Sequence, residues 1–131
     1  MPTATGTFEV TIGGEDAFHE RSGEPRLARA HGTQRFSGDI EGDGVVEWLN
    51  CYLPAGTARL IGLQRIEGTI AGRRGSLVIE TLADHDGRQS RGSWRIIDGS
   101  GTGDLAGISG SGGFEARGGT TVSYTLDYEL G

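Results

Sequence analysis

The stretch TVSYTLDYEL, residues 121–130, decides the fold class of this chain. Its apolar side chains fall at every second position, and polar side chains fill the positions between them. Successive side chains of a β-strand point to opposite faces, so this alternation is typical of a strand with one buried and one wet face. The segment TGTFEVTI, residues 5–12, repeats the pattern near the other end of the sequence. Both segments are therefore predicted to be strands.

The remaining strand-like segments lie between these two and are separated by Gly-rich or Asp-Gly turns. They are Arg29–Ser37, Val45–Leu53, Ala58–Ile70, Ser76–Leu82, Arg91–Ile97 and Gly113–Arg117. This makes about eight strands, which either stack as a sandwich or close as a barrel. Pairing of the first strand with the last would remove both exposed edges. We therefore expect an all-β, eight-stranded antiparallel barrel without long helices.

Composition limits the architecture and the partners. With 131 residues, the chain is long enough for one domain, and a single β-barrel domain over residues 1–131 is expected. The 25 glycines disfavour helices, which agrees with a β-structure. A net charge of −6 and a pI near 5.0 argue against nucleic acid, which binds basic surfaces. No apolar run is long enough for a transmembrane helix, and the N-terminal residues do not resemble a signal peptide. A cytoplasmic protein that does not bind membranes is expected.

The stretch DGSGTGDLAGISGSGG, Asp98–Gly113, resembles a dinucleotide-binding motif in one part, Gly101–Ala106. That motif binds phosphate where a helix begins at its glycines. Four more glycines follow within residues 107–113 and disfavour a helix, so this stretch is predicted to form turns with positive φ angles. No nucleotide and no other cofactor is expected. The three histidines lack the spacing of a metal site, so no metal is expected either.

Several longer motifs carry a family resemblance. FSGDIEGDGVVEWL (residues 36–49), GLQRIEGTIAGRRGS (62–76), GSGTGDLAGISGSGGF (99–114) and the closing YTLDYEL resemble a bacterial family of small proteins known as a domain of unknown function. The resemblance extends from Gly6 to Leu130 and implies the allene oxide cyclase-like, or calycin-like, β-barrel. The glycine-rich segment is also similar to a turn of plant allene oxide cyclases and dirigent proteins. This similarity implies a fold and no chemistry, because no cyclase motif maps onto residues of this chain.

A barrel of this size is filled by side chains or holds one small ligand. The charged groups expected in such a cavity are Glu67, Glu47 and Arg35, in that order, with Gln64 as a lesser polar candidate. An inward carboxylate with a raised pKa could act as an acid or base. The alternative is that all three face water. The candidate walls are aromatic, and the alternative, which the usual packing role of large aromatic residues favours, is that they are plain core: Trp48, Tyr52, Trp94, Phe114 and Tyr124.

Two functional classes follow from this cavity. The first is a cofactor-independent enzyme of cyclase or isomerase type that folds an apolar substrate inside the barrel. The second is a non-catalytic carrier or binding module for an apolar metabolite. A filled barrel that acts through protein interactions is a further alternative, and a homo-oligomer is possible. An inward carboxylate with a shifted pKa favours the enzyme, and a wholly apolar cavity favours the carrier.

Overall fold

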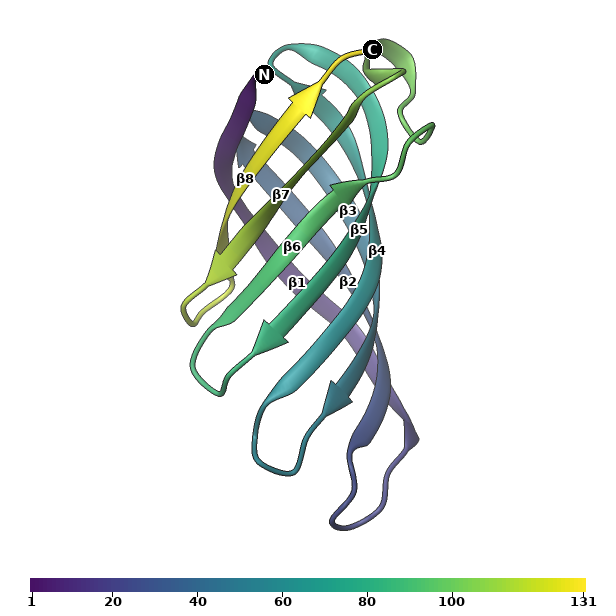
Figure 1. Ribbon diagram of the computed structural model, residues 1–131, viewed down its shortest axis with the longest axis vertical. Coiled ribbons are helices and arrows are strands. Elements are labelled where there is room, and N and C mark those ends of the chain that lie inside the picture. Colours follow the sequence, from purple (N-terminus) through teal and green to yellow (C-terminus); the bar gives the residue numbers. More distant parts are fainter.

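The structure, a computed structural model that describes residues 1–131, is a closed barrel of antiparallel strands (Figure 1). Each strand pairs with the next one along the chain, and β1 pairs with β8 to close the barrel. The strands are β1 (Thr3–His19), β2 (Arg26–Gly38), β3 (Ile40–Tyr52), β4 (Ala58–Ile70), β5 (Arg73–His85), β6 (Ser90–Ile96), β7 (Ser109–Ala116) and β8 (Thr121–Glu129). The predicted fold class, an all-β antiparallel barrel closed by its first and last strands, is confirmed.

Helical structure is confined to the 3-10 helix η1 (Gly103–Leu105), as expected from the glycine content. It is far too short and too polar to cross a membrane. The strands are mostly longer than their sequence patterns predicted. The largest difference is in β1, which continues from the expected end at Ile12 to His19, where most of its residues are exposed and no alternation marks the strand. Pairing with β2 extends this part of β1.

One half of the barrel interior is filled by a continuous hydrophobic core. The ring of Phe8 packs against several aromatic residues of this core, with its centroid 4.9 Å from that of Phe36 and 5.7 Å from that of Trp94. The Tyr124 hydroxyl accepts a hydrogen bond from the Ile40 backbone N–H at 2.9 Å, which ties β8 to the start of β3. Buried aromatic rings of this size contribute most of the apolar area that stabilises a small core.

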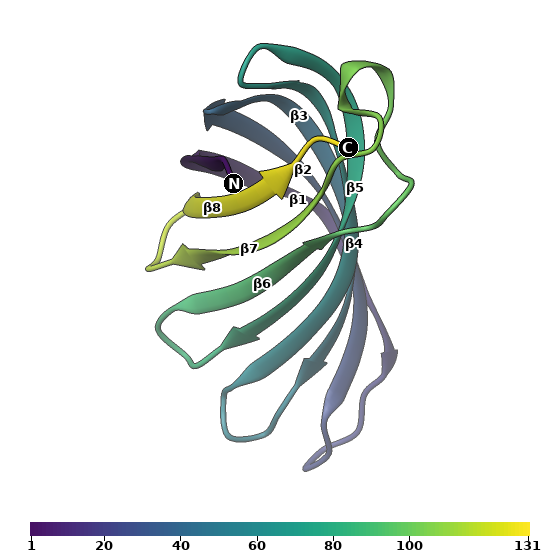
Figure 2. The same ribbon diagram turned by 45° about the horizontal axis from the view of Figure 1, so that its top comes forward.

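The glycine-rich stretch Asp98–Gly113 lies at this packed end, close to the C-terminus (Figure 2). As predicted, residues 98–108 form a connection with several glycines at positive φ, among them Gly103 at 60° and Gly107 at 83°. The predicted connection is too long at its end, because residues 109–113 already belong to β7. It inserts Leu105 and Ile108, each 2 % exposed or less, into the core. The glycines therefore allow the chain to fold a plug over one end of the barrel.

The opposite end of the barrel carries the hairpin turns at residues 20–25, 53–57, 86–89 and 117–120. Figure 1 shows these turns as a descending series, with the β1–β2 hairpin extending farthest from the termini. The glycine-rich stretch covers the packed end with apolar side chains, and none of these hairpin turns covers the opposite end in this way. The strand ends here therefore surround the hollow part of the barrel.

Candidate cavity in the open half of the barrel

The three charged residues expected inside the barrel lie on its outer surface. The side chains of Arg35, Glu47 and Glu67 are 72 %, 49 % and 59 % exposed. Each forms an ion pair there: Arg35 with Asp43, Glu47 with Arg29 and Glu67 with Arg65. The expectation that they line the interior is wrong, because their strand neighbours of opposite parity, such as Val46 and Ile66, are the inward residues.

A cavity of about 250 Å³ occupies the open half of the barrel. Its walls are mainly apolar and come from all eight strands. The residues that line it are Phe8, Val10, Ile12, Glu15, Ala30, Gln34, Trp48, Asn50, Tyr52, Leu60, Gln64, Thr81, Ala83, Ser90, Phe114, Ala116 and Val122. An apolar cavity of about 150 Å³ holds benzene, so this volume admits a ligand of roughly ten non-hydrogen atoms.

The predicted aromatic residues divide between the two halves of the interior. Trp48, Tyr52 and Phe114 line the cavity. Trp94 and Tyr124 lie in the packed half, 1 % and 3 % exposed, where their rings stack with centroids 5.7 Å apart. The alternation of burial along their strands places all five side chains on the inward side. It contains no information about position along the barrel axis, which decides between wall and core.

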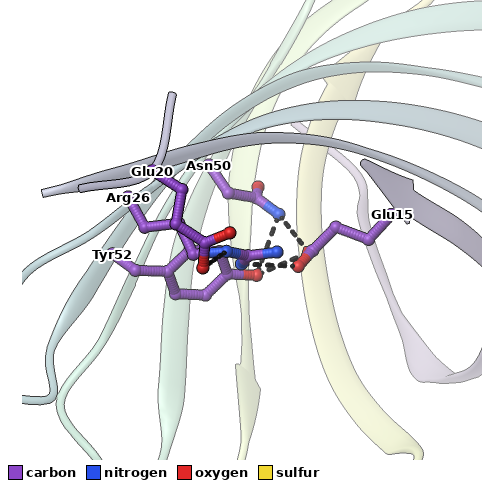
Figure 3. Close-up of polar contacts among 5 residues, drawn as sticks. All are labelled: Glu15, Glu20, Arg26, Asn50 and Tyr52. Atoms are coloured by element: carbon purple, nitrogen blue, oxygen red, sulfur yellow. Dashed lines mark hydrogen bonds and ion pairs between the residues drawn. The ribbon is translucent and has the colours of Figure 1, made fainter. Parts of the chain in front are cut away.

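A polar cluster lies at the mouth of the cavity and is built around Glu15 (Figure 3). The Tyr52 hydroxyl donates to Glu15 Oε2 at 2.6 Å, and Asn50 Nδ2 donates to the same oxygen at 3.0 Å. Arg26 donates to Glu15 Oε1 at 3.1 Å and also forms an ion pair with Glu20. These contacts join the part of β1 that follows Ile12 to β2 and β3 at the mouth of the barrel.

A β-bulge turns Glu15 toward the interior. Ile12 pairs with Gly32 and Gly14 with His31, so Gly13 is an extra residue with no partner in β2. The extra residue shifts the parity of the residues that follow it, as far as the next register shift after Ala17, and Glu15 comes to lie opposite the buried Ala30. Without the bulge, odd-numbered residues of β1 would continue to face water. The one sequence signal for this site is the Gly13-Gly14 pair directly before Glu15, because paired glycines in a strand often mark a bulge.

The hydrogen bonds of the cluster shift two pKa values in opposite directions. The Tyr52 hydroxyl, with Arg26 and Asn50, outweighs the effect of burial and lowers the pKa of Glu15 below its ordinary value of 4.5. Burial first, and then the hydrogen bond to the carboxylate, raises the pKa of Tyr52 above 10.0. At neutral pH the cluster therefore contains an ionised carboxylate and a protonated phenol.

A second polar group lies deep in the cavity, at its boundary with the core. Gln34, Gln64 and Thr81 are each at most 4 % exposed, and Gln64 Nε2 donates to Gln34 Oε1 at 3.0 Å. Four buried polar atoms of cavity-lining residues have no hydrogen-bond partner within the protein: Gln34 Nε2, Trp48 Nε1, Asn50 Oδ1 and Thr81 Oγ1. No three His, Cys, Asp or Glu side chains lie close enough together to hold a metal ion.

The fold and this cavity define a class: a closed eight-stranded antiparallel barrel with one packed half and one hollow half. The chain belongs to the family described as "Protein of unknown function (DUF3224)", whose model matches residues 4–128. This confirms the resemblance to a domain of unknown function with a barrel fold. A crystal structure of a protein of unknown function from the same family, from Shewanella oneidensis MR-1, superposes with a TM-score of 0.85 at 23 % identity, covering 100 % of this chain and 98 % of that one. No curated protein matched the chain.

Proposed function

We propose that this protein is a non-catalytic carrier or binding module that holds one small, mostly apolar molecule in the open half of its barrel. The observation that carries the proposal is the cavity of about 250 Å³, with apolar walls and a few buried polar groups that lack partners in the protein. Binding sites for small molecules typically combine an apolar lining with a small number of placed polar groups. A barrel of eight strands has room for one such ligand.

The alternative is a cyclase or isomerase, and the Glu15–Tyr52 pair at the mouth is the observation in its favour. An acid or base works best when its pKa lies near the working pH. Here the lowered pKa makes Glu15 a weak base, and the raised pKa makes Tyr52 a weak acid. Both shifts move away from neutrality, so the pair supports a structural role at the mouth more than proton transfer.

Filling the cavity tests the proposal, with α-methylstyrene as the apolar probe because its nine non-hydrogen atoms match the cavity volume. In titration calorimetry we expect one site per chain in the wild-type protein. Ala83→Phe places a ring in the cavity and should weaken binding at least about tenfold. Leu82→Phe is the matched control, since Leu82 is the neighbour of Ala83 on the outer face and is 38 % exposed. It should leave the affinity unchanged.

Two results would contradict the proposal. Absence of saturable binding to the wild-type protein is the first. The second is binding that Leu82→Phe weakens and Ala83→Phe does not, which would locate the probe on the outer surface. Melting temperatures of both variants should be compared, so that loss of binding is not mistaken for loss of folding.

A further inference from the structure

We infer that the ligand of this cavity carries a carbonyl-type acceptor oxygen that is bound deep in the barrel by Gln34, Trp48 and Thr81; this rests on the proposed function and names the class of ligand. The first observation is the position of the polar groups. Gln34 and Thr81 lie two residues from the core residues Phe36 and Ile79 on the same faces of β2 and β5. They therefore form the polar floor of the cavity.

The second observation is the chemistry of the unpartnered atoms. Gln34 Nε2 and Trp48 Nε1 can only donate hydrogen bonds, and Thr81 Oγ1 can donate or accept. Asn50 Oδ1, the one pure acceptor without a partner, belongs to the mouth cluster, where Asn50 Nδ2 contacts Glu15. The unpartnered atoms of Gln34 and Thr81 on the floor and of Trp48 in the wall can therefore all donate. A buried donor without a partner is unfavourable, so a ligand that supplies an acceptor oxygen gains more here than a hydrocarbon of the same shape.

The third observation is the space reserved for these donors. A Cβ at Gly44 would lie 2.9 Å from Gln34 Oε1, and a Cβ at Gly62 would lie 2.5 Å from Trp48 Cδ1. Both contacts are closer than side chains tolerate, so glycine at these positions of β3 and β4 lets the amide and the indole lie flat against the barrel wall. The two glycines thus leave room for the donors beside the cavity.

The mouth cluster does not compete for the role of selecting the ligand. Three donors of the protein already occupy the carboxylate oxygens of Glu15: Tyr52, Asn50 and Arg26. A cationic or amine-bearing ligand would have to break these bonds to reach the carboxylate. The donors without a partner therefore lie outside the mouth cluster, whose one unpartnered atom is the acceptor Asn50 Oδ1, and these donors select for an acceptor.

Acetophenone and α-methylstyrene form a matched pair for the test, because they differ in having C=O or C=CH₂ at the same position. A purely apolar cavity would favour α-methylstyrene by about tenfold or more, since the ketone loses its hydrogen bonds to water. We expect wild-type protein to bind acetophenone at least as tightly as α-methylstyrene in titration calorimetry. Thr81→Val should weaken acetophenone binding by about three- to tenfold and leave α-methylstyrene binding unchanged or tighter.

A double variant, Gln34→Leu with Gln64→Leu, removes the amide pair together and leaves neither amide without its partner. It should also weaken acetophenone binding selectively. Thr33→Val removes an exposed hydroxyl from the outer face of β2 and is the matched control. A wild-type preference for α-methylstyrene, or an equal loss of both ligands in Thr81→Val, would overturn this inference and leave the binding barrel standing. Failure of both ligands to bind the wild-type protein would overturn the two proposals together.

Discussion

Glu15 shows how a single residue can organise the mouth of the barrel. Its two carboxylate oxygens accept hydrogen bonds from three side chains that belong to β2 and β3. Hydrogen bonds to a charged acceptor are stronger than those between neutral groups. The ionised carboxylate therefore stabilises the fold as well as closing the rim of the cavity.

Glu15→Gln should lower the free energy of unfolding by about 1–2 kcal/mol at neutral pH, because the amide cannot satisfy all three donors. The pKa of Glu15 is lowered in the folded state, so this stabilisation is fully present above the ordinary value of 4.5 and is lost as the pH falls through the lower folded value. Denaturant unfolding at several pH values should show the difference between wild type and variant shrinking below about pH 4.5. A difference that stays constant to pH 2 would contradict the assignment. The pKa of Asp86, lowered by hydrogen bonds from Gln89 and Arg88, affects both proteins equally.

At the scale of the strands, the backbones of β3 and β4 lie close together at Gly42 and Gly68, which are paired in the register. A Cβ at Gly42 would collide with the backbone oxygen of Glu67, and Gly42 has a φ of 149°. Glycines at such positions allow a strand to bend sharply where a barrel turns a corner. This bend lies next to Ile40 and Ile70, in the packed half of the barrel.

Gly42→Ala should therefore lower the free energy of unfolding by about 2–4 kcal/mol, from the strained backbone and the collision combined. Gly14→Ala is the matched control, because no atom lies within 4 Å of the added methyl group and the φ of Gly14 is not positive. The control should change stability by less than about 0.5 kcal/mol. Equal effects of the two substitutions in thermal or denaturant unfolding would contradict this account of the bend.

The strands could be predicted from the sequence because their alternation is local. Ala58–Ile70 was predicted with the bounds that β4 has in the structure. Of the candidates named from the sequence, Gln64 is the one polar residue that lines the cavity, because it shares the inward positions of β4. The charged candidates do not line it: Glu67 is followed by Gly68, which takes the inward position and leaves Glu67 outside. Glu15 was missed because its direction depends on the bulge at Gly13, a property of the pairing between β1 and β2.

At the scale of the whole molecule, the interior of the barrel consists of a packed half and a hollow half. The half near the termini is filled by aromatic and aliphatic side chains and plugged by Leu105 and Ile108. The half near the hairpin turns is hollow and has small residues such as Ala30 and Ala83 in its wall. The closure of the sheet could be predicted from its first and last strands. The division into a packed and a hollow half depends on where the large inward side chains lie along the barrel axis. That position follows from the register between the strands, which the sequence pattern does not contain.

An apolar probe could also bind outside the barrel, because several aliphatic side chains face water on β3 and β4. Leu49, Ile61 and Leu63 are 54 %, 52 % and 54 % exposed, and Leu49 and Ile61 are paired in the register. Exposed apolar patches of this kind bind other molecules when they are large enough. A decisive measurement must therefore report where the ligand lies as well as whether it binds.

An amide-resolved NMR titration of the wild-type protein with α-methylstyrene is that measurement. Binding in the open half predicts saturable shifts for the amides of Ala30, Asn50 and Ala83, which line the cavity or pack beside it. The chemical shifts of the amides of Ile40 and Leu126, in the packed half, should not change. Shifts centred on the outer residues Leu49, Ile61 and Leu63, or the absence of saturable shifts, would contradict the claim that the hollow half of the barrel is a binding site.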